Sequence, residues 1–325
     1  MGIWMSDITV DLPEAGRLEE LLLGGTALYR QSEIAALTGV PEITCLRIWQ
    51  ALGFPTPPPD MVAFTRQDAA ALQDIRELLD FDQIDEELVV HLSRAVGQTM
   101  GRLASWLGDV WIKRIFDGSV DLDSLADLLP RFERLLLQGW RRHLAASGMR
   151  ALASVGDTPS TAAELTVGFA DIVSFTELSR NMDGDVLAAF VERFEVVATE
   201  ICTEFGGRIV KTLGDEVLFS ADSPVAAAEI ALRITERSGL DDSFPRIRAG
   251  LAYGPVVQSL GDVFGTPVNL AARLTAQANP GSVLIDARLE AELADRFETA
   301  VLKPRTLQGL GKVRPWSLRR RALSD

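Results

Sequence analysis

The segment V-K-T-L-G-D-E-V-L-F, from Val210 to Phe219, constrains the fold of this chain more than any other stretch. Apolar residues on both sides of Gly214 predict two short strands joined by a tight turn. Lys211 lies on the first strand and Asp215 lies in the turn. One hairpin therefore displays a cation and an anion, an arrangement suited to a polyanionic ligand and a metal ion.

Two companion segments strengthen this signal: G-F-A-D-I-V-S-F-T-E-L begins at Gly168, and G-D-V-F-G-T-P-V-N-L-A-A-R-L begins at Gly261. Around them, strands and helices alternate. We expect strands at 165–172, 208–220 (the hairpin), 246–257 and 282–286, helices at 185–205, 224–237, 266–278 and 287–296, and a last pair of strands around a glycine turn. This pattern predicts an α+β or α/β fold in which helices pack on one mixed sheet, and we assign the class as α+β.

The first half of the chain has only helical patterns. Residues 32–54 predict two short helices joined by a tight turn, with Ser32 as N-cap and Gly39 as the stop of the first helix. With the helix expected after Thr65, this order resembles the helix-turn-helix start of MerR-type regulators. Residues 25–80 hold four Arg and no Lys against seven Asp and Glu, which argues against DNA binding and favours a protein-contact role.

Longer helical runs follow at 84–116 and 122–146, and we expect Trp106 and Trp111 to be packed there. No loop in this half gathers catalytic residue types. We therefore assign residues 1–150 to an all-α regulatory or dimerisation domain. Residues 151–164 lose periodicity and collect Gly, Pro, Ser and Thr, so they are expected to form a linker to a catalytic domain at 165–325.

Composition limits the classes of protein that fit. With 325 residues, 47% apolar and 24% charged, the chain can bury two cores. Its formal charge of −14 argues against a broad electrostatic grip on nucleic acid or anionic membrane. Two distant cysteines suggest no disulfide framework, and no apolar run approaches the roughly 18 to 20 residues of a membrane span. These features predict a cytoplasmic protein.

The three motif segments carry the residues expected to do chemistry. Asp171 ends a buried strand and Asp215 caps the adjacent hairpin, so the two carboxylates can hold Mg²⁺ or Mn²⁺, which prefer oxygen ligands. Asn269 and Arg273 are four residues apart on an expected helix and share a face, from which the arginine could contact phosphoryl oxygens. Taken singly, each carboxylate could be a solvated turn residue, and the arginine a surface residue.

Together, the three segments closely resemble the catalytic domain of class III nucleotidyl cyclases, over about residues 164–320. In that resemblance Asp171 and Asp215 match the metal-binding aspartates, with the main-chain carbonyl of Ile172 as a further ligand. Lys211 and Asp262 match the pair that reads the purine, in the combination for adenine. The remaining matches are Asn269, which orients the ribose, and Arg273, which stabilises the transition state.

The resemblance implies an adenylyl cyclase that converts ATP to 3′,5′-cyclic AMP and pyrophosphate with two Mg²⁺ or Mn²⁺ ions per site. In this family the aspartates come from one subunit and the other four side chains from its partner, so a homodimer with two composite sites is expected. The family's triphosphate-binding lysine has no clear counterpart, and Lys303, Arg305 and Lys312 are the candidates.

The whole chain also resembles mycobacterial-type soluble adenylyl cyclases in which a helical N-terminal domain restrains the catalytic domain. That resemblance suggests autoinhibition, and it leaves a small-molecule or lipid regulator of the helical domain open. His143 lies beside two arginines near the linker, which favours its neutral form and makes it a candidate pH switch. The alternative is a histidine with no switching role.

Two rival functions remain at this stage. L-G-D-E-V echoes the Gly-Gly-Asp-Glu-Phe signature of diguanylate cyclases, but the first glycine is absent and Asn269 and Arg273 have no place in that scheme. The second rival is a transcription regulator or nucleotide-sensing protein with a non-catalytic cyclase-like domain. The complete catalytic set argues against it.

Overall fold

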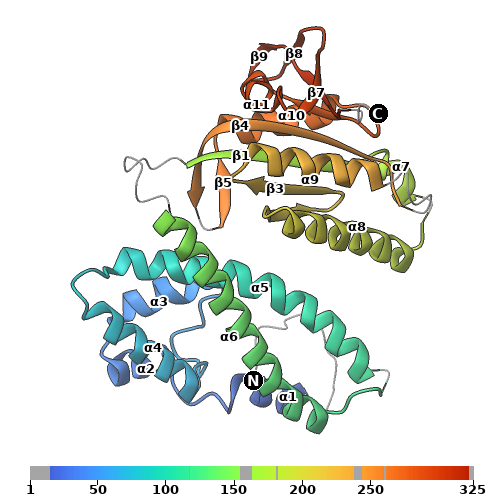
Figure 1. Ribbon diagram of the computed structural model, residues 1–325. Coiled ribbons are helices and arrows are strands. Elements are labelled where there is room, and N and C mark those ends of the chain that lie inside the picture. The colour runs from blue at the N-terminus through green and yellow to red at the C-terminus, as the bar shows by residue number, and fades with distance from the viewer. Residues whose placement is uncertain are drawn as a thin grey trace. The chain divides into compact units, whose positions relative to one another are not determined.

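The computed structural model describes residues 15–116, 118–153, 163–180, 182–237, 244–259 and 261–321. The chain divides into two compact units, residues 1–154 and 155–325 (Figure 1). The N-terminal unit contains the helices α1 (Ala15–Leu23), α2 (Gln31–Thr38), α3 (Glu42–Ala51), α4 (Arg66–Leu79), α5 (Glu86–Phe116) and α6 (Leu122–Ala153). Apart from one isolated bridge between Tyr29 and Phe64, the described part of this unit is helical, as the sequence predicts.

Helix boundaries follow local capping chemistry. The positive φ of 71° at Gly39 ends α2, and the Thr65 side chain accepts a hydrogen bond from the amide of Asp68 at the start of α4. The prediction of Ser32 as N-cap is wrong, because α2 begins at Gln31, two residues earlier than that cap would place it. Its N-cap is Arg30, whose backbone amide donates to the Glu33 carboxylate.

The core of the N-terminal unit is small and lies among α2, α3, α4 and the start of α5. Ile34, Ile48 and Val89 are buried in it. At Gly97 a Cβ atom would lie 2.3 Å from the carbonyl oxygen of Leu52, so α5 approaches the end of α3 at a distance that only glycine permits. Arg47 of α3 forms ion pairs with Glu86 and Glu87 of α5, which fixes the same contact electrostatically.

The distal part of α5 and much of α6 expose large apolar side chains. Trp106 is 61% exposed, so the prediction that it is packed is wrong; helical periodicity identifies an apolar face without showing what covers it. On α6, Leu135, Trp140 and Met149 are also exposed. Among the described residues, no helix is both long and apolar enough to cross a membrane.

The C-terminal unit contains one mixed sheet, as predicted, with strands in the order β2-β3-β1-β4-β6-β10-β7 and β5 paired to β4. β4 and β6 are parallel, and the other pairs in this sheet are antiparallel. The strands are β1 (Ala163–Ile172), β2 (Arg208–Leu213), β3 (Glu216–Ala221), β4 (Ile247–Ser259), β5 (Asp262–Phe264), β6 (Val283–Ile285), β7 (Phe297–Val301) and β10 (Trp316–Arg320), while β8 (Arg305–Leu307) and β9 (Gly311–Val313) form a separate hairpin. The helices are α7 (Phe175–Arg180), α8 (Gly184–Glu204), α9 (Pro224–Glu236), α10 (Thr266–Gln277) and α11 (Ala287–Leu293).

Helices cover both faces of the sheet. Residues of α8, α9 and α11 share one apolar cluster with Phe219 and Leu251, and Figure 1 shows α9 running along the strands. α10 packs on the opposite face with Val167 and Phe169. Alternate residues of the central strands therefore enter two different cores.

The predicted linker, 151–164, lies partly outside the described residues. α6 continues through Ala153, and β1 begins at Ala163, two residues before the expected strand start. Residues 154–162 lie outside the part of the chain that the structure describes.

Candidate active site

The predicted metal aspartates lie at the end of β1 and in the β2–β3 turn. Gly214 has a φ of 72°, which permits the tight turn, and Asp215 follows it. The amide of Ile172 donates a hydrogen bond of 3.0 Å to the Asp215 carbonyl, and this bond joins the end of β1 to the β2–β3 turn. Burial raises the pKa of Asp171, and the neighbouring charge of Asp215 raises it further. The fold therefore places the two carboxylates close together.

A row of charged residues crosses the three central strands at this point. In strand register, Glu216 of β3 lies opposite Asp171 of β1, which lies opposite Arg248 of β4. Arg248 Nε and Nη2 approach the same Asp171 oxygen, Oδ2, at 2.7 and 2.6 Å. The Asp171 side chain is only 13% exposed, so this ion pair is largely withdrawn from water. The guanidinium opposes the effect of burial on the pKa of Asp171.

Glu216 and Arg248 are site residues that the sequence reasoning missed. Burial, reinforced by Asp171 and Asp215, raises the pKa of Glu216 to about 7. The signal that could have found both residues is strand register, because directly opposed residues of neighbouring strands share a face. Register depends on strand pairing, which one sequence alone did not define.

Lys211 and Asp262, the predicted purine readers, meet across β2 and β5. Lys211 Nζ lies 2.5 Å from Asp262 Oδ2, and the two side chains are 34% and 26% exposed. The other carboxylate oxygen, Oδ1, accepts a hydrogen bond of 2.8 Å from the Val263 amide. Residues 51 positions apart in the chain are thereby held as one partly buried, oriented pair.

Asn269 and Arg273 lie on α10, as predicted, and both are exposed. Across the described residues, neither side chain forms a hydrogen bond or ion pair, either with the carboxylates or with the Lys211–Asp262 pair. The helix itself is firmly seated: at Gly250 a Cβ atom would lie 2.3 Å from the Thr275 amide nitrogen. The rigid scaffold thus presents these two groups outward.

Residues 158–320 match the family model of the adenylate and guanylate cyclase catalytic domain. The chain belongs to this cyclase family. It is 36% identical to an adenylate cyclase of Streptomyces coelicolor, covering 95% of this chain and 90% of that protein, and 35% identical to one from Glutamicibacter nicotianae, covering 96% and 85%. It is also 28% identical to a pH-sensitive adenylate cyclase of Mycobacterium tuberculosis, covering 99% of this chain and 86% of that protein.

Cyclases of this family use divalent metal ions, and the residues here fit such ions. The described residues contain no cluster of three or more His, Cys, Asp or Glu side chains arranged around one point. The fit rests instead on two neighbouring carboxylates, Asp171 and Asp215, with the adjacent backbone carbonyl of Ile172. Such an all-oxygen set suits Mg²⁺ or Mn²⁺, which keep coordination positions for water and phosphate.

The three candidate triphosphate cations of the cyclase differ in their surroundings. Arg305 Nη1 donates to the backbone carbonyl of Gln277 at 2.9 Å and to its side-chain oxygen at 2.8 Å, at the end of α10. This contact satisfies a terminal helix carbonyl. Lys303 precedes β8 and Lys312 lies on β9, and both are exposed.

His143 of the cyclase lies on α6 and is exposed, as are its neighbours Arg141 and Arg142. Within the described part of the chain it has no hydrogen-bond or ion-pair partner.

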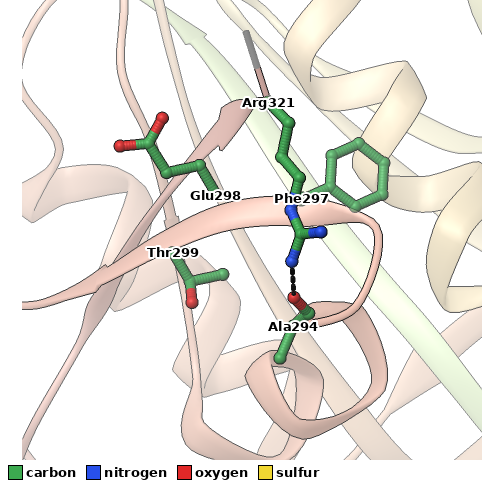
Figure 2. A pocket seen from close by; sticks show the side chains of 5 residues that line it. All are labelled: Ala294, Phe297, Glu298, Thr299 and Arg321. Carbon is green, nitrogen blue, oxygen red and sulfur yellow. Dashed lines mark hydrogen bonds between the residues drawn. The ribbon is translucent and has the colours of Figure 1, made fainter. Parts of the chain in front are cut away.

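A separate pocket lies between the end of α11, β7 and the last described residues. Figure 2 shows that Arg321 Nη2 donates to the carbonyl of Ala294, at 2.6 Å. Phe297, Glu298 and Thr299 complete the lining. None of the predicted site residues lines this pocket, so it is distinct from the catalytic constellation.

Proposed function

We propose that this cyclase converts ATP to 3′,5′-cyclic AMP and pyrophosphate. The observation that carries the choice of ATP is the oriented ion pair between Lys211 and Asp262. An amine and a carboxylate side by side offer a donor and an acceptor to the edge of a purine, and adenine presents the complementary amino group and ring nitrogen. The relatives named adenylate cyclases support the same choice.

In the proposed reaction the ribose 3′-oxygen attacks the α-phosphorus in line. The new O3′–Pα bond forms as the bond from Pα to the bridging oxygen of pyrophosphate breaks, and the hydroxyl proton is released to water. Asn269 orients the ribose, which makes the attack intramolecular and well aligned. Arg273 stabilises the charge that develops on the transferring phosphoryl group. Asp171, Asp215 and the Ile172 carbonyl would hold the divalent ions.

Two divalent ions bound there would supply Lewis-acid chemistry, by lowering the pKa of the 3′-hydroxyl and offsetting the triphosphate charge. For the triphosphate itself we favour Lys303 or Lys312. Arg305 is already engaged with Gln277, so it would have to give up two hydrogen bonds to reach a phosphate.

We further propose a homodimer with two composite sites. The exposed, unengaged Asn269 and Arg273 support this assembly, because such groups are available to complete a site on a second chain. Mixing two inactive variants tests it. Asp215→Ala and Arg273→Ala homodimers should each be inactive, while subunit exchange should recover about a quarter of wild-type activity, since half the dimers carry one intact site of two. No recovery after confirmed exchange would place both sets in one chain.

We propose that the N-terminal unit regulates the catalytic unit through the segment between them. In this proposal residues 1–150 form the regulatory domain, residues 151–164 the linker and residues 165–325 the catalytic domain. The similarity to a pH-sensitive adenylate cyclase supports a pH response. His143 is the candidate sensor, because protonation would add a third positive charge beside Arg141 and Arg142. Cyclic AMP production by the full chain from pH 5.5 to 8 tests this, and an unchanged profile in His143→Ala would reject His143.

DNA binding receives no support from the surface of α3. Its one arginine, Arg47, is engaged by Glu86 and Glu87 and is not free to contact phosphate. The helix-turn-helix-like start is better explained as a packing element of the regulatory unit.

Substrate choice is tested by the paired change Lys211→Glu with Asp262→Cys, which removes the adenine-reading combination. We expect the ATP-over-GTP ratio of kcat/KM to fall by about tenfold or more, because unpaired polar groups discriminate strongly against a mismatched base edge. An unchanged ratio in a folded, active double variant would reject the purine-reading assignment, while cyclic AMP production by the wild type tests the reaction itself.

A further inference from the structure

Thr275 joins α10 to the sheet through a buried hydroxyl group. The residue is 1% exposed. Its hydroxyl oxygen lies 2.9 Å from the carbonyl oxygen of Ala271, one turn earlier in α10, and 3.3 Å from the carbonyl oxygen of Phe169 in β1. A hydroxyl carries one proton, so the helix and the strand share it. The contact with Phe169 connects residues 106 positions apart in the chain.

Beneath Thr275, the backbone of the sheet touches the backbone of α10. Gly250 of β4 lies opposite Phe169 in strand register. At Gly250 a Cβ atom would lie 2.3 Å from the Thr275 amide nitrogen and 2.7 Å from its hydroxyl oxygen. The missing side chain therefore lets the helix rest directly on the sheet, and the Thr275 hydroxyl lies at this contact.

The contacts under α10 determine where Asn269 and Arg273 lie. Both residues are exposed and, in the proposed dimer, complete a site on the second chain. Ala271 and Leu274, which are also buried under the helix, make apolar contacts that have no preferred direction. A hydrogen bond has a preferred distance and angle, so the Thr275 hydroxyl can fix the helix in one register on the sheet. Misplacement of a catalytic group by about 1 Å can cost about a hundredfold in rate.

We propose that Thr275 is a positioning residue for the cyclase reaction: its hydroxyl, shared with β1, sets the place of Arg273 at the transferring phosphoryl group. Thr275 is buried under the helix and acts through Arg273, which is two residues earlier and points outward. The inference rests on the proposed function of Arg273 and on the proposed dimer. Displacement of a group that acts in the transition state lowers kcat and leaves the KM for ATP nearly unchanged.

Steady-state kinetics of the full chain test this role. Thr275→Val removes the hydroxyl and keeps the size of the side chain, so kcat should fall about tenfold, with the KM for ATP within about threefold of wild type. Thr275→Ala, which also lacks the hydroxyl, should give at least the same loss and replaces the valine variant if that protein does not fold. Thr275→Ser keeps the hydroxyl, and its kcat should stay within about threefold of wild type.

The matched control is Thr235→Val on α9. Thr235 is also buried, and its hydroxyl donates to the Ala231 carbonyl of its own helix at 2.9 Å. The same chemical change there should lower the melting temperature to a similar degree and leave kcat unchanged. A comparison of the two valine variants therefore separates a loss of position from a loss of stability.

A mixed-dimer experiment identifies the element through which Thr275 acts. When Asp215→Ala and Arg273→Ala chains are mixed, the intact site takes its arginine from the Asp215→Ala chain and its aspartates from the other. Thr275→Val added to the Asp215→Ala chain should lower the recovered activity about tenfold. The same change in the Arg273→Ala chain should leave the recovered activity unchanged, which also shows that a chain with valine at this position folds and pairs.

Three results would overturn the positioning role and leave the cyclase function standing. They are a kcat of Thr275→Val within threefold of wild type, an equal loss of kcat in Thr235→Val, and an equal loss in both mixed dimers. A wild-type chain that makes no cyclic AMP overturns the proposed function and the role of Thr275 together.

Discussion

Two rows of residues cross the same three strands, β3, β1 and β4, three positions apart. One row consists of Phe219, Gly168 and Leu251, and its two side chains are fully buried against α8 and α9. At Gly168 a Cβ atom would lie 2.3 Å from the Phe219 ring, so this row leaves no space. The other row, Glu216, Asp171 and Arg248, lies toward the strand end on the face that α10 covers.

The difference between the rows shows how one strand serves stability and chemistry at once. An odd spacing along β1 moves the side chain to the opposite face, so Gly168 and Asp171 belong to different environments although they are near in sequence. The apolar row stabilises the sheet by exclusion of water. In the charged row, burial raises the pKa of Glu216 to about 7, so this carboxylate is ionised only at a cost, as is common at binding and catalytic sites.

The largest expected effect comes from the turn beside the charged row. Asp215→Ala should lower cyclic AMP production by roughly a thousandfold, because it removes a ligand of the proposed metal pair. The backbone hydrogen bond from Ile172 to residue 215 survives the change, so the melting temperature should stay close to that of wild type. Activity within tenfold of wild type would contradict the assignment of Asp215.

The apolar row should respond in the opposite way. Phe219→Ala should lower the free energy of unfolding by about 3 to 5 kcal/mol, because it empties a fully buried ring position. Urea unfolding measures this effect, and the Mn²⁺ affinity of the fraction that remains folded should be unchanged. A large loss of Mn²⁺ affinity without loss of stability would show that the two rows are not separate in function.

A smaller effect should come from Asp286, a buried carboxylate whose role is structural. It caps α11 through the Leu289 amide and accepts from the Tyr253 amide of β4, at 3.1 and 3.3 Å. Burial raises its pKa above the ordinary value near 4. The folded protein therefore holds this proton more tightly than the unfolded chain does. Stability should fall as pH rises from about 4 through the raised pKa, and become level above it.

Asp286→Asn isolates this contribution, because asparagine caps a helix about as well as aspartate and does not ionise. Urea unfolding of both proteins between pH 4 and 7 should show wild type losing stability relative to the variant as pH rises. Parallel curves over this range would mean that Asp286 ionises without cost and that burial is not the dominant cause.

Much of this molecule could be predicted from sequence. The hairpin around Asp215 and the helix that carries Asn269 and Arg273 follow from glycine positions and from periodicity, which are local properties. The exposure of Trp106 could not be predicted, because the periodicity of α5 does not say whether a partner element covers its apolar face. Ser32 failed as a cap because Arg30 and Glu33 form the capping box at the start of α2, so Ser32 lies inside the first turn.

By itself the sequence determined the division into a helical half and an α+β half, the residue types of the catalytic set and the family to which the chain belongs. Tertiary structure alone decided which charges meet. Lys211 contacts Asp262, which is 51 residues away in the chain, and Arg248 contacts Asp171, which is 77 residues away. These encounters depend on strand register, which arises when the sheet pairs and buries its two faces, and no local property of either segment encodes it.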